Sequence, residues 1–356
     1  MDTATLASKV VVSPATPVSP EHILKLGMGY WASKTVLTAV QLKLFTILAQ
    51  KPHSAGEIRE RLGLHERSYL DFLDALVALK LLKRKGLGGE AIYSNTPETD
   101  TFLDRNKPSY LGGILEMSNN RLYKYWNDLE EGLKTGLPQN ELKDSHSESQ
   151  FNDFYSNPES LAEFMRAMAG IQMGAFISLA QQFDFSPYRR FVDIGGGNGS
   201  LSIQVALHNP QIECTTFDLP VVEPVAKDTI DRFSLSTRIR TAGGDFFNDD
   251  LPQGDVVAMG NVLHDWNEKE KLLLMKKAFD LLPAGGAFVC IESIIDNNRS
   301  ENAFGLLMSL NMLIETKGGF DYTFNDFDRW AHQSGFHRTE WLPLAGPTSA
   351  AIAYKA

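Results

Sequence analysis

Residues 191–200 read FVDIGGGNGS, an apolar run that ends in a glycine-rich loop and leads into a segment of helical character. Glycines allow the backbone to turn sharply and to approach a ligand closely. The spacing of Gly195, Gly197 and Gly199 departs from the G-x-G-x-x-G of a dinucleotide loop, because the third glycine comes one residue early, and Asp193 stands two positions before the first. This shorter loop lacks the usual arrangement for a pyrophosphate at a helix N-terminus, so it predicts a nucleoside cofactor without phosphates.

The glycine loop belongs to a series of short apolar runs separated mostly by segments of helix length. The runs are residues 191–194, 214–219, 239–242, 255–259 and 287–292. Such alternation predicts an α/β fold with a doubly wound parallel sheet that binds ligands at the carboxyl ends of its strands. Two final runs, 340–344 and 350–355, are joined by a Gly-Pro turn and predict an antiparallel pair at the sheet edge.

Acidic residues stand where the second and third runs end. Asp218 and Leu219 follow the glycine loop by about 20 residues, where a carboxylate accepts hydrogen bonds from a ribose in doubly wound folds. The next run ends in Gly244, Asp245 and Phe246. An acid there could bind the edge of an adenine, and the aromatic ring beside it could pack on the adenine face. One such acid alone could merely cap a helix. Acids at the ends of successive strands lie at the same edge of the sheet, which favours a shared binding site.

The fourth run leads into residues 260–267, GNVLHDWN. His264 falls at the same sheet edge, where a neutral imidazole could act as a general base. A lone histidine is more often structural, and the residues from Asn267 to Glu270 also resemble an ordinary helix start with a reciprocal cap. The motif therefore has both a catalytic and a structural interpretation.

The chain of 356 residues suffices for about two domains. After a tail interrupted by prolines, the pattern predicts two helices over residues 21–50, a capped helix after Ser54, a helix over 65–82 and a hairpin over 83–94. This is the order of a winged helix, whose second helix reads DNA in many proteins. That helix would present Glu66, Asp71 and Asp74, and the chain carries a formal charge of −10, so nucleic acid is an unfavourable partner.

Residues 110–182 are again helical in pattern and rich in methionine and aromatic side chains. Most of these suit core packing, and a minority suit an adaptable apolar pocket for a planar ligand. The only cysteines, Cys214 and Cys290, fall inside apolar strands and are interpreted as reduced core residues. With no run of about 18 apolar residues and no secretory pattern, we expect a cytoplasmic protein with no membrane partner.

Taken together and in this order, the motifs resemble the S-adenosylmethionine-dependent O-methyltransferases of the caffeate and hydroxyindole type. The stretches that carry the resemblance are DIGGGNG at 193–199, FDLP at 217–220, GDFF at 244–247 and LHDW at 263–266. The resemblance runs from about residue 21 to the end. It implies a Rossmann-like catalytic domain, S-adenosylmethionine as cofactor, S-adenosylhomocysteine as product, and a winged-helix-like domain that forms a homodimer rather than binding DNA.

The resemblance also divides the chain into a flexible leader (1–20), a dimerisation domain (21–108), a helical connector lining the substrate pocket (109–185) and a cofactor-binding catalytic domain (186–356). It implies catalytic roles for three residues: His264 as base, with Glu292 and Asp321 as the carboxylates that orient it. Asp321 lies in GGFDYT (318–323), which is similar to the family's Gly-Gly-Lys-Glu-Arg-Thr. Gly260 stands where plant members have a lysine near the cofactor, so that contact should be absent.

The remaining site residues are carried over from the same resemblance. The cofactor-binding set is Asp193, Gly195, Gly197, Gly199, Asp218, Leu219, Gly244, Asp245, Phe246, Asn261, Asp265, Phe151, Met168 and Gln172. The substrate-binding set is Met117, Trp126, Phe164, Met308, Asn311 and Met312. Asn311 is an amide on an apolar segment, so it either bonds the acceptor or satisfies an internal partner.

The leading hypothesis is therefore O-methylation of a small aromatic hydroxyl. Transfer to nitrogen or carbon, or non-methylating chemistry on the same scaffold, stays open. A nicotinamide-dependent oxidoreductase is disfavoured by the glycine spacing, and a DNA-binding regulator by the acidic composition. No cysteine and histidine cluster has metal-ligand spacing, so we expect catalysis without a metal.

Overall fold

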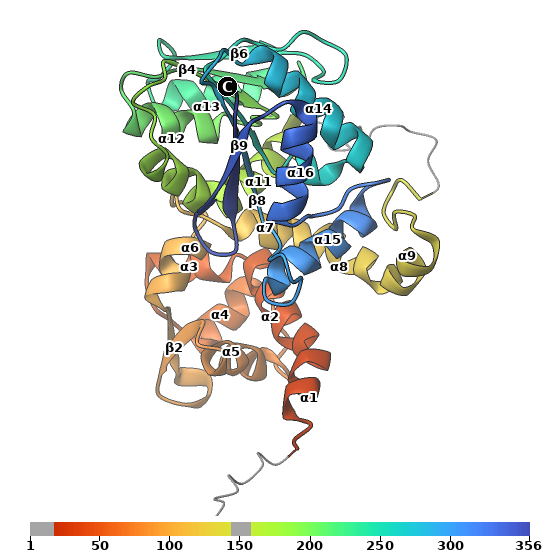
Figure 1. Ribbon diagram of the computed structural model, residues 1–356. Helices are drawn as coiled ribbons and strands as arrows, with labels where there is room; N and C mark the ends of the chain where they lie inside the picture. Colours follow the sequence, from red (N-terminus) through yellow and green to blue (C-terminus); the bar gives the residue numbers. More distant parts are fainter. Residues whose placement is uncertain (1–17, 144–157) are drawn as a thin grey trace, which may run out of the picture.

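The computed structural model describes residues 18–143 and 158–356 (Figure 1). The predicted leader lies outside the described residues except for its last three. In the described part, an amino-terminal group of small helices and strands is joined by connector helices to a larger α/β body. A three-stranded and a seven-stranded sheet mark these two parts.

The larger sheet has the strand order β6-β5-β4-β7-β8-β10-β9. Its strands are β4 (Arg190–Ile194), β5 (Glu213–Asp218), β6 (Ile239–Gly243), β7 (Val256–Gly260), β8 (Ala287–Glu292), β9 (Arg338–Pro343) and β10 (Ser349–Tyr354). The first five pair in parallel, and β10 runs antiparallel between β8 and β9, with Ser349 opposite Glu292. The predicted doubly wound sheet with an antiparallel pair at one edge is confirmed.

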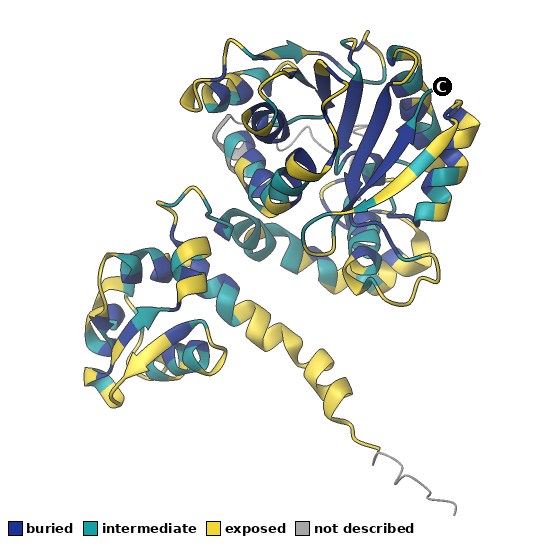
Figure 2. Ribbon diagram, turned by 60° about the vertical axis from the view of Figure 1, so that its left-hand side comes forward, coloured by how far each residue is buried: buried dark blue, intermediate teal, exposed yellow. Residues whose placement is uncertain are grey.

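Helices cover both faces of this sheet. One apolar core joins the strands to α11 (Pro158–Gln182), α12 (Ser200–His208) and α13 (Glu223–Arg232). The other joins them to α14 (Glu268–Leu281) and α16 (Phe324–Ser334). Every residue of β8 is buried (Figure 2), as expected for a strand at the centre of a sheet covered on both sides. The carboxyl ends of the parallel strands are left to form a common edge.

Local sequence signals explain where α14 begins. The Asn267 side chain accepts a hydrogen bond from the Glu270 backbone N–H at 3.1 Å, and the Glu270 carboxylate accepts one from the Asn267 N–H at 3.0 Å. This reciprocal cap was one of the two interpretations of the motif after His264. The cap therefore lies three residues after His264 and fixes the end of its loop.

The amino-terminal part contains α1 (Glu21–Gly27), α2 (Gly29–Gln41), α3 (Leu44–Gln50), β1 (His53–Ser54), α4 (Ala55–Leu62), α5 (Tyr69–Ala78), β2 (Leu82–Lys85) and β3 (Ile92–Asn95). The hairpin and the Ser54 cap are confirmed. Two helix predictions were wrong. Residues 21–50 form three helices, because the chain breaks both at Met28 and at Lys43, which has a left-handed φ of 58°. The helix expected over 65–82 is shorter, so Glu66 lies in the preceding turn.

The connector is helical, as predicted, within the part that the structure describes. Helix α6 (Pro97–Leu103) precedes it and packs on α3. The connector itself contains α7 (Gly112–Met117), a π-helical turn (Ser118–Leu122), α8 (Tyr123–Tyr125), a 3-10 turn (Trp126–Asp128) and α9 (Leu129–Thr135), and α11 continues it into the catalytic body. Helix α7 packs against both α2 and α11. It therefore links the amino-terminal helices to the sheet.

The first two helices expose apolar side chains. Helix α1 and the start of α2 extend away from the rest of the chain and are drawn as exposed in Figure 2. The exposed large apolar side chains there are Ile23, Leu24, Leu26, Met28, Tyr30 and Trp31. Among the described helices, none alone is long and apolar enough to cross a membrane. Residues 21–41 joined to α3 would reach that length and apolar composition together, but the pair is bent by 56°.

Candidate active site at the carboxyl edge of the sheet

The glycine loop joins β4 to α12, and its conformation explains why glycines occupy it. Gly195, Gly197 and Gly199 have φ values of +70°, +55° and +78°, which side chains other than glycine rarely adopt. Gly196 is required for a different reason, since a Cβ there would lie 2.1 Å from the Thr216 hydroxyl oxygen. The loop is thus a tight cradle that leaves no room for side chains.

Asp218, at the end of β5, braces this loop. Its Oδ2 accepts a hydrogen bond from the Gly197 N–H at 2.8 Å, and its Oδ1 accepts one from the Leu219 N–H at 2.7 Å. Burial raises the pKa of Asp218 to about 6 despite these bonds. Burial, together with the charge of Asp218, raises the pKa of Asp193 to about 7. The predicted ribose acceptor is therefore also a structural clamp on the glycine loop.

Asp245, which follows the end of β6, is likewise both a predicted cofactor residue and part of the local structure. Asp245 accepts hydrogen bonds from the Phe247 N–H at 2.9 Å and from the Asn248 side chain at 2.6 Å, so it stabilises its own turn. The ring of Phe246 lies edge to face with Trp266 at a centroid distance of 5.8 Å. An aromatic cluster therefore connects the predicted adenine side with the loop that follows β7.

His264 lies in a 3-10 turn (Leu263–Asp265) directly after β7 and is only 6% exposed. Its Nδ1 is 3.3 Å from Oδ1 of Asp321, and its Nε2 is 3.7 Å from Oδ1 of Asp265. The backbone N–H of His264 donates to Oε1 of Glu292 at 3.0 Å. The three residues predicted as base and carboxylates are therefore together, but Glu292 bonds the backbone of His264, whereas Asp321 bonds its ring.

Asp321 is held from two directions. Its backbone N–H donates to the Ser309 hydroxyl on α15 (Ala303–Glu315) at 3.1 Å. Two residues further on, Thr323 forms a parallel bridge with Ile295, which follows β8. The carboxylate beside the imidazole is thus fixed by the same helix that carries the predicted acceptor residues.

The electrostatics of this cluster are dominated by burial and by negative charge. Burial alone would lower the pKa of His264, but the charge and hydrogen bond of Asp321, with Asp265 and Glu292, raise that pKa to about 10. Burial raises the pKa of Asp265 to about 6, against the opposite effect of His264, and it also raises the pKa of Glu292. The imidazole is consequently a strong proton acceptor whose protonated form the carboxylates stabilise.

The predicted acceptor side is formed by two separate parts of the chain. The indole N–H of Trp126 donates to Oδ1 of Asn311 at 2.9 Å, so the amide oxygen has an internal partner. Helix α15 carries Met308, Asn311 and Met312, and Met117 is the last residue of α7. On α11, the side chains of Phe164 and Met168 are half-buried. Phe151, predicted on the cofactor side, lies outside the described residues.

Three further cofactor predictions have a clear place in the structure. The buried Oε1 of Gln172 has no hydrogen-bond partner within residues 18–143 and 158–356, and a Cβ on Gly260 would lie 3.4 Å from it. Gly260 therefore lies directly beside the Gln172 side chain. Asn261 has a left-handed φ of 51° and turns the chain out of β7 toward His264.

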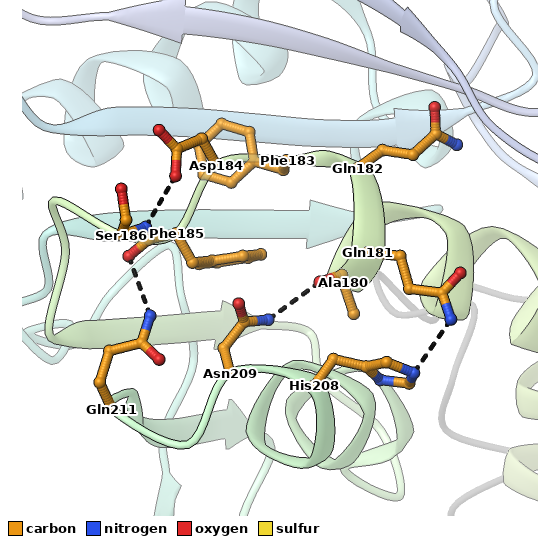
Figure 3. A pocket seen from close by; sticks show the side chains of 10 residues that line it. All are labelled: Ala180, Gln181, Gln182, Phe183, Asp184, Phe185, Ser186, His208, Asn209 and Gln211. Carbon is orange, nitrogen blue, oxygen red and sulfur yellow. Dashed lines mark hydrogen bonds between the residues drawn. The ribbon is translucent and has the colours of Figure 1, made fainter.

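A surface hollow of about 560 Å³ lies at the opposite end of the sheet (Figure 3). It is lined by residues 180–186 at the end of α11, by His208 at the end of α12, and by Asn209 and Gln211. Its polar groups already bond one another, for example Asn209 to the Ala180 carbonyl at 2.9 Å. None of the predicted site residues line it.

The sequence reasoning missed Lys271, which is fully buried on α14 beside the His264 cluster. A signal for it existed, because Lys271 precedes the buried Leu274, Met275 and Ala278 by three, four and seven positions. That spacing places it on the apolar face of the helix. It also missed the contact of the Tyr322 hydroxyl with the Cys290 sulfur at 3.0 Å.

A glycine loop, strand-end carboxylates and a buried histidine at the carboxyl edge of a seven-stranded doubly wound sheet define a Rossmann-like class I methyltransferase. Within this class, the chain belongs to the O-methyltransferase family. The family's O-methyltransferase domain matches residues 126–337, and its O-methyltransferase dimerisation domain matches residues 24–105.

Similar proteins extend over nearly the whole chain. The tetracenomycin polyketide synthesis 8-O-methyl transferase TcmO of Streptomyces glaucescens is 38% identical and covers 97% of this chain and 99% of its own. The 3-hydroxy-5-methyl-1-naphthoate 3-O-methyltransferase of Streptomyces sahachiroi is 31% identical, with 94% of each chain covered. Human N-acetylserotonin methyltransferase in complex with S-adenosylmethionine superposes with a TM-score of 0.88 at 26% identity, covering 97% of this chain and 100% of its own.

The protein is therefore an S-adenosylmethionine-dependent O-methyltransferase. The site suits that cofactor: the glycine cradle carries no side chains over its positive-φ positions, and the buried Gln172 oxygen offers an unused acceptor. Among the described residues, no group of His, Cys, Asp or Glu has the arrangement of a metal site.

Proposed function

We propose that this enzyme methylates a hydroxyl group of a small aromatic molecule, with His264 as the general base. The observation that carries the proposal is the buried pair of His264 and Asp321, 3.3 Å apart, at the carboxyl edge of the sheet. The relatives named for a polyketide and a naphthoate support an aromatic acceptor. Secondary metabolism is the expected setting.

The acceptor must lose a proton as it reacts. A phenol with a pKa near 10 is mostly protonated at neutral pH and is then a poor nucleophile. Since the surrounding carboxylates raise the pKa of His264 to about 10, the base is its neutral form, whose share grows as the pH rises toward 10. In that form the proton on Nδ1 is held by Asp321, so Nε2 is left to accept one from the hydroxyl. Asp321 and Asp265 then stabilise the imidazolium, and such general-base assistance is typically worth about 10²- to 10⁴-fold in rate.

S-Adenosylmethionine, when bound, supplies the electrophilic methyl group that the acceptor oxygen takes. The residues proposed to hold it are Asp193, Gly195, Gly197, Gly199, Asp218, Leu219, Gly244, Asp245, Phe246, Asn261, Asp265, Met168 and Gln172, with Phe151 carried as a prediction. Asp218 keeps the glycine cradle in place through Gly197. The acceptor side is proposed to use Met117, Trp126, Phe164, Met308, Asn311 and Met312.

The test is transfer of a labelled methyl group from S-adenosylmethionine to a panel of phenols, catechols, hydroxyindoles and hydroxyquinones. We expect the wild type to label hydroxyl oxygens and His264→Ala to be at least about 100-fold slower, while S-adenosylhomocysteine still binds. His208→Ala is the matched control, because that histidine lies at the opposite end of the sheet. Equal rates for wild type and His264→Ala would exclude His264 as the base. Labelling of nitrogen or carbon, or none at all, would exclude O-methylation of these acceptors.

We also propose that the enzyme works as a homodimer through the exposed apolar side chains of α1 and the start of α2. The dimerisation domain match covers these helices from residue 24. Side chains such as Leu26 and Trp31, which are 68% and 58% exposed, lose this exposure when a second copy covers them. The domain boundaries, a cytoplasmic location and the lack of nucleic-acid or membrane partners stay predictions.

A further inference from the structure

Lys271 is a buried cation that the proposed mechanism does not use. It lies in the first turns of α14 with no exposed surface. Its Nζ donates a hydrogen bond to the Trp266 carbonyl and sits over the Phe320 ring, 3.7 Å from the centroid. A lysine is almost never fully buried unless paired, because removing an ammonium from water is costly.

The two contacts of Lys271 belong to the two segments that hold the proposed base pair. Trp266 follows His264 by two residues, and its carbonyl ends the 3-10 turn that carries the imidazole. Phe320 immediately precedes Asp321, the carboxylate that faces the imidazole. One ammonium group therefore ties the His264 turn to the Asp321 segment.

The same ammonium lies among several buried carboxylates. The titratable groups around it are His264 and Asp265 of the 3-10 turn, Cys290 and Glu292 of β8, and Asp321 and Tyr322 of the segment before α16. On α16 itself, Asp326 and Arg329 pair with each other at 3.0 Å. Three carboxylates around one imidazole leave excess negative charge, which a buried cation offsets.

The residues on either side of Asp321 carry no charge. Phe320 and Tyr322 are both aromatic, and both rings are contacts of Lys271, at 3.7 and 5.6 Å from Nζ to the ring centroids. The two neighbours of Asp321 in sequence therefore supply no cation beside it, and Lys271 supplies one from α14.

We propose that Lys271 is a positioning residue for methyl transfer, which holds the His264 turn against the Asp321 segment and supplies the cation that keeps the surrounding carboxylates ionised. This inference rests on the proposed role of His264. Burial lowers the pKa of Lys271 to about 8, while Glu292, Asp321 and Asp265 act in the opposite direction. Losing the cation should raise the pKa values of its carboxylate and imidazole neighbours, so activity should require a higher pH.

The experiment compares two substitutions that separate charge from hydrogen bonding. Lys271→Gln keeps a donor for the Trp266 carbonyl but loses the charge, whereas Lys271→Arg keeps the charge. Lys355→Gln is a matched control, because Lys355 also donates to backbone carbonyls, of Phe279 and Leu282, and lies 4.4 Å from the Phe279 ring centroid. It does so at the far end of α14, away from the site carboxylates.

Two measurements are made on each variant. The first is the pH profile of kcat with an acceptor from the labelling panel. The second is an NMR titration of the His264 imidazole in the S-adenosylhomocysteine complex, with the resonance assigned by its loss in His264→Ala. The titration needs no acceptor, so it tests Lys271 even if methyl transfer to hydroxyls fails.

We expect the low-pH limb of the kcat profile and the His264 midpoint to rise by at least about one pH unit in Lys271→Gln. The rate at pH 7 then falls about tenfold or more and recovers at higher pH. Lys271→Arg should restore both toward wild type, and Lys355→Gln should leave both unchanged. Wild-type midpoints in Lys271→Gln, or a rate loss that is equal at every pH, would overturn the proposal. If Lys271→Gln does not fold, Lys271→Met takes its place under the same criteria.

Discussion

Replacement of Asp321 by asparagine tests the electrostatic core of the site. The substitution keeps the shape of the side chain and removes one negative charge 3.3 Å from Nδ1 of His264. At an effective dielectric constant of about 20, a charge pair at this distance is worth about 5 kcal/mol. Because each pKa unit corresponds to about 1.36 kcal/mol, the pKa of His264 should fall by about 4 from its raised value.

The stability of the folded protein is a second readout of the charges around His264. A histidine whose folded pKa is raised from 6.5 to about 10 stabilises the fold fully below pH 6.5, and this contribution is lost as the pH rises through 10. That interval corresponds to about 5 kcal/mol for the combined effect of burial and the three carboxylates, of which Asp321 contributes most. The difference in free energy of unfolding between wild type and Asp321→Asn should therefore be largest near pH 6 and shrink toward pH 10.

The assays are urea unfolding at several pH values and the NMR titration of His264. Asp328→Asn is the matched control, since Asp328 lies 3.4 Å from Nε2 of His332 but both side chains are exposed, where ion pairs contribute little. We also expect kcat of Asp321→Asn to fall by about 10²- to 10⁴-fold at pH 10, where about half of the wild-type His264 is neutral, because the imidazole loses its fixed tautomer. An unchanged His264 midpoint, or a destabilisation that does not vary with pH, would refute this reasoning.

Three further predictions concern other parts of the molecule. Gly196→Ala should destabilise the fold by about 1–3 kcal/mol and weaken S-adenosylhomocysteine binding, measured by calorimetry, because its Cβ would lie 2.1 Å from the Thr216 hydroxyl oxygen; wild-type values for both would contradict the close-packed cradle. Cys214 and Cys290 should resist thiol reagents at pH 8 until the protein unfolds, since burial raises the pKa of Cys214 to about 12 and that of Cys290 well above its ordinary value; rapid labelling of native protein would argue otherwise. Leu26→Glu should shift the protein from dimer to monomer in light scattering with little loss of helix content, and a wild-type mass would place the dimer interface elsewhere.

Much of the fold could be predicted because its signals are local. The alternation of apolar runs determined the strands, and the reciprocal caps of Ser54 and Asn267 follow from neighbouring residues. The predictions of helix ends were less accurate where the backbone conformation departs from what the hydrophobic pattern indicates. The left-handed Lys43 is an example, because nothing in its side chain requires that φ.

The contacts within the site were harder to predict, because they depend on segments far apart in sequence. Glu292 reaches the backbone of His264 only through the register of β7 and β8. Trp126 and Asn311 are separated by 185 positions, so their hydrogen bond has no local signal. Lys271 was overlooked for a different reason: a charged residue on an apolar helix face was not treated as buried.

The position of β10 affects the order in which the protein can be assembled. Glu292 ends a strand whose second neighbour is β10, with Ser349 directly opposite. During synthesis on a ribosome, the glycine loop and the His264 turn emerge well before this partner strand does. A nascent chain that stops short of β10 exposes β8 as an unpaired edge beside a half-built catalytic centre. Chaperone protection is therefore most needed in the interval between synthesis of Glu292 and of β10.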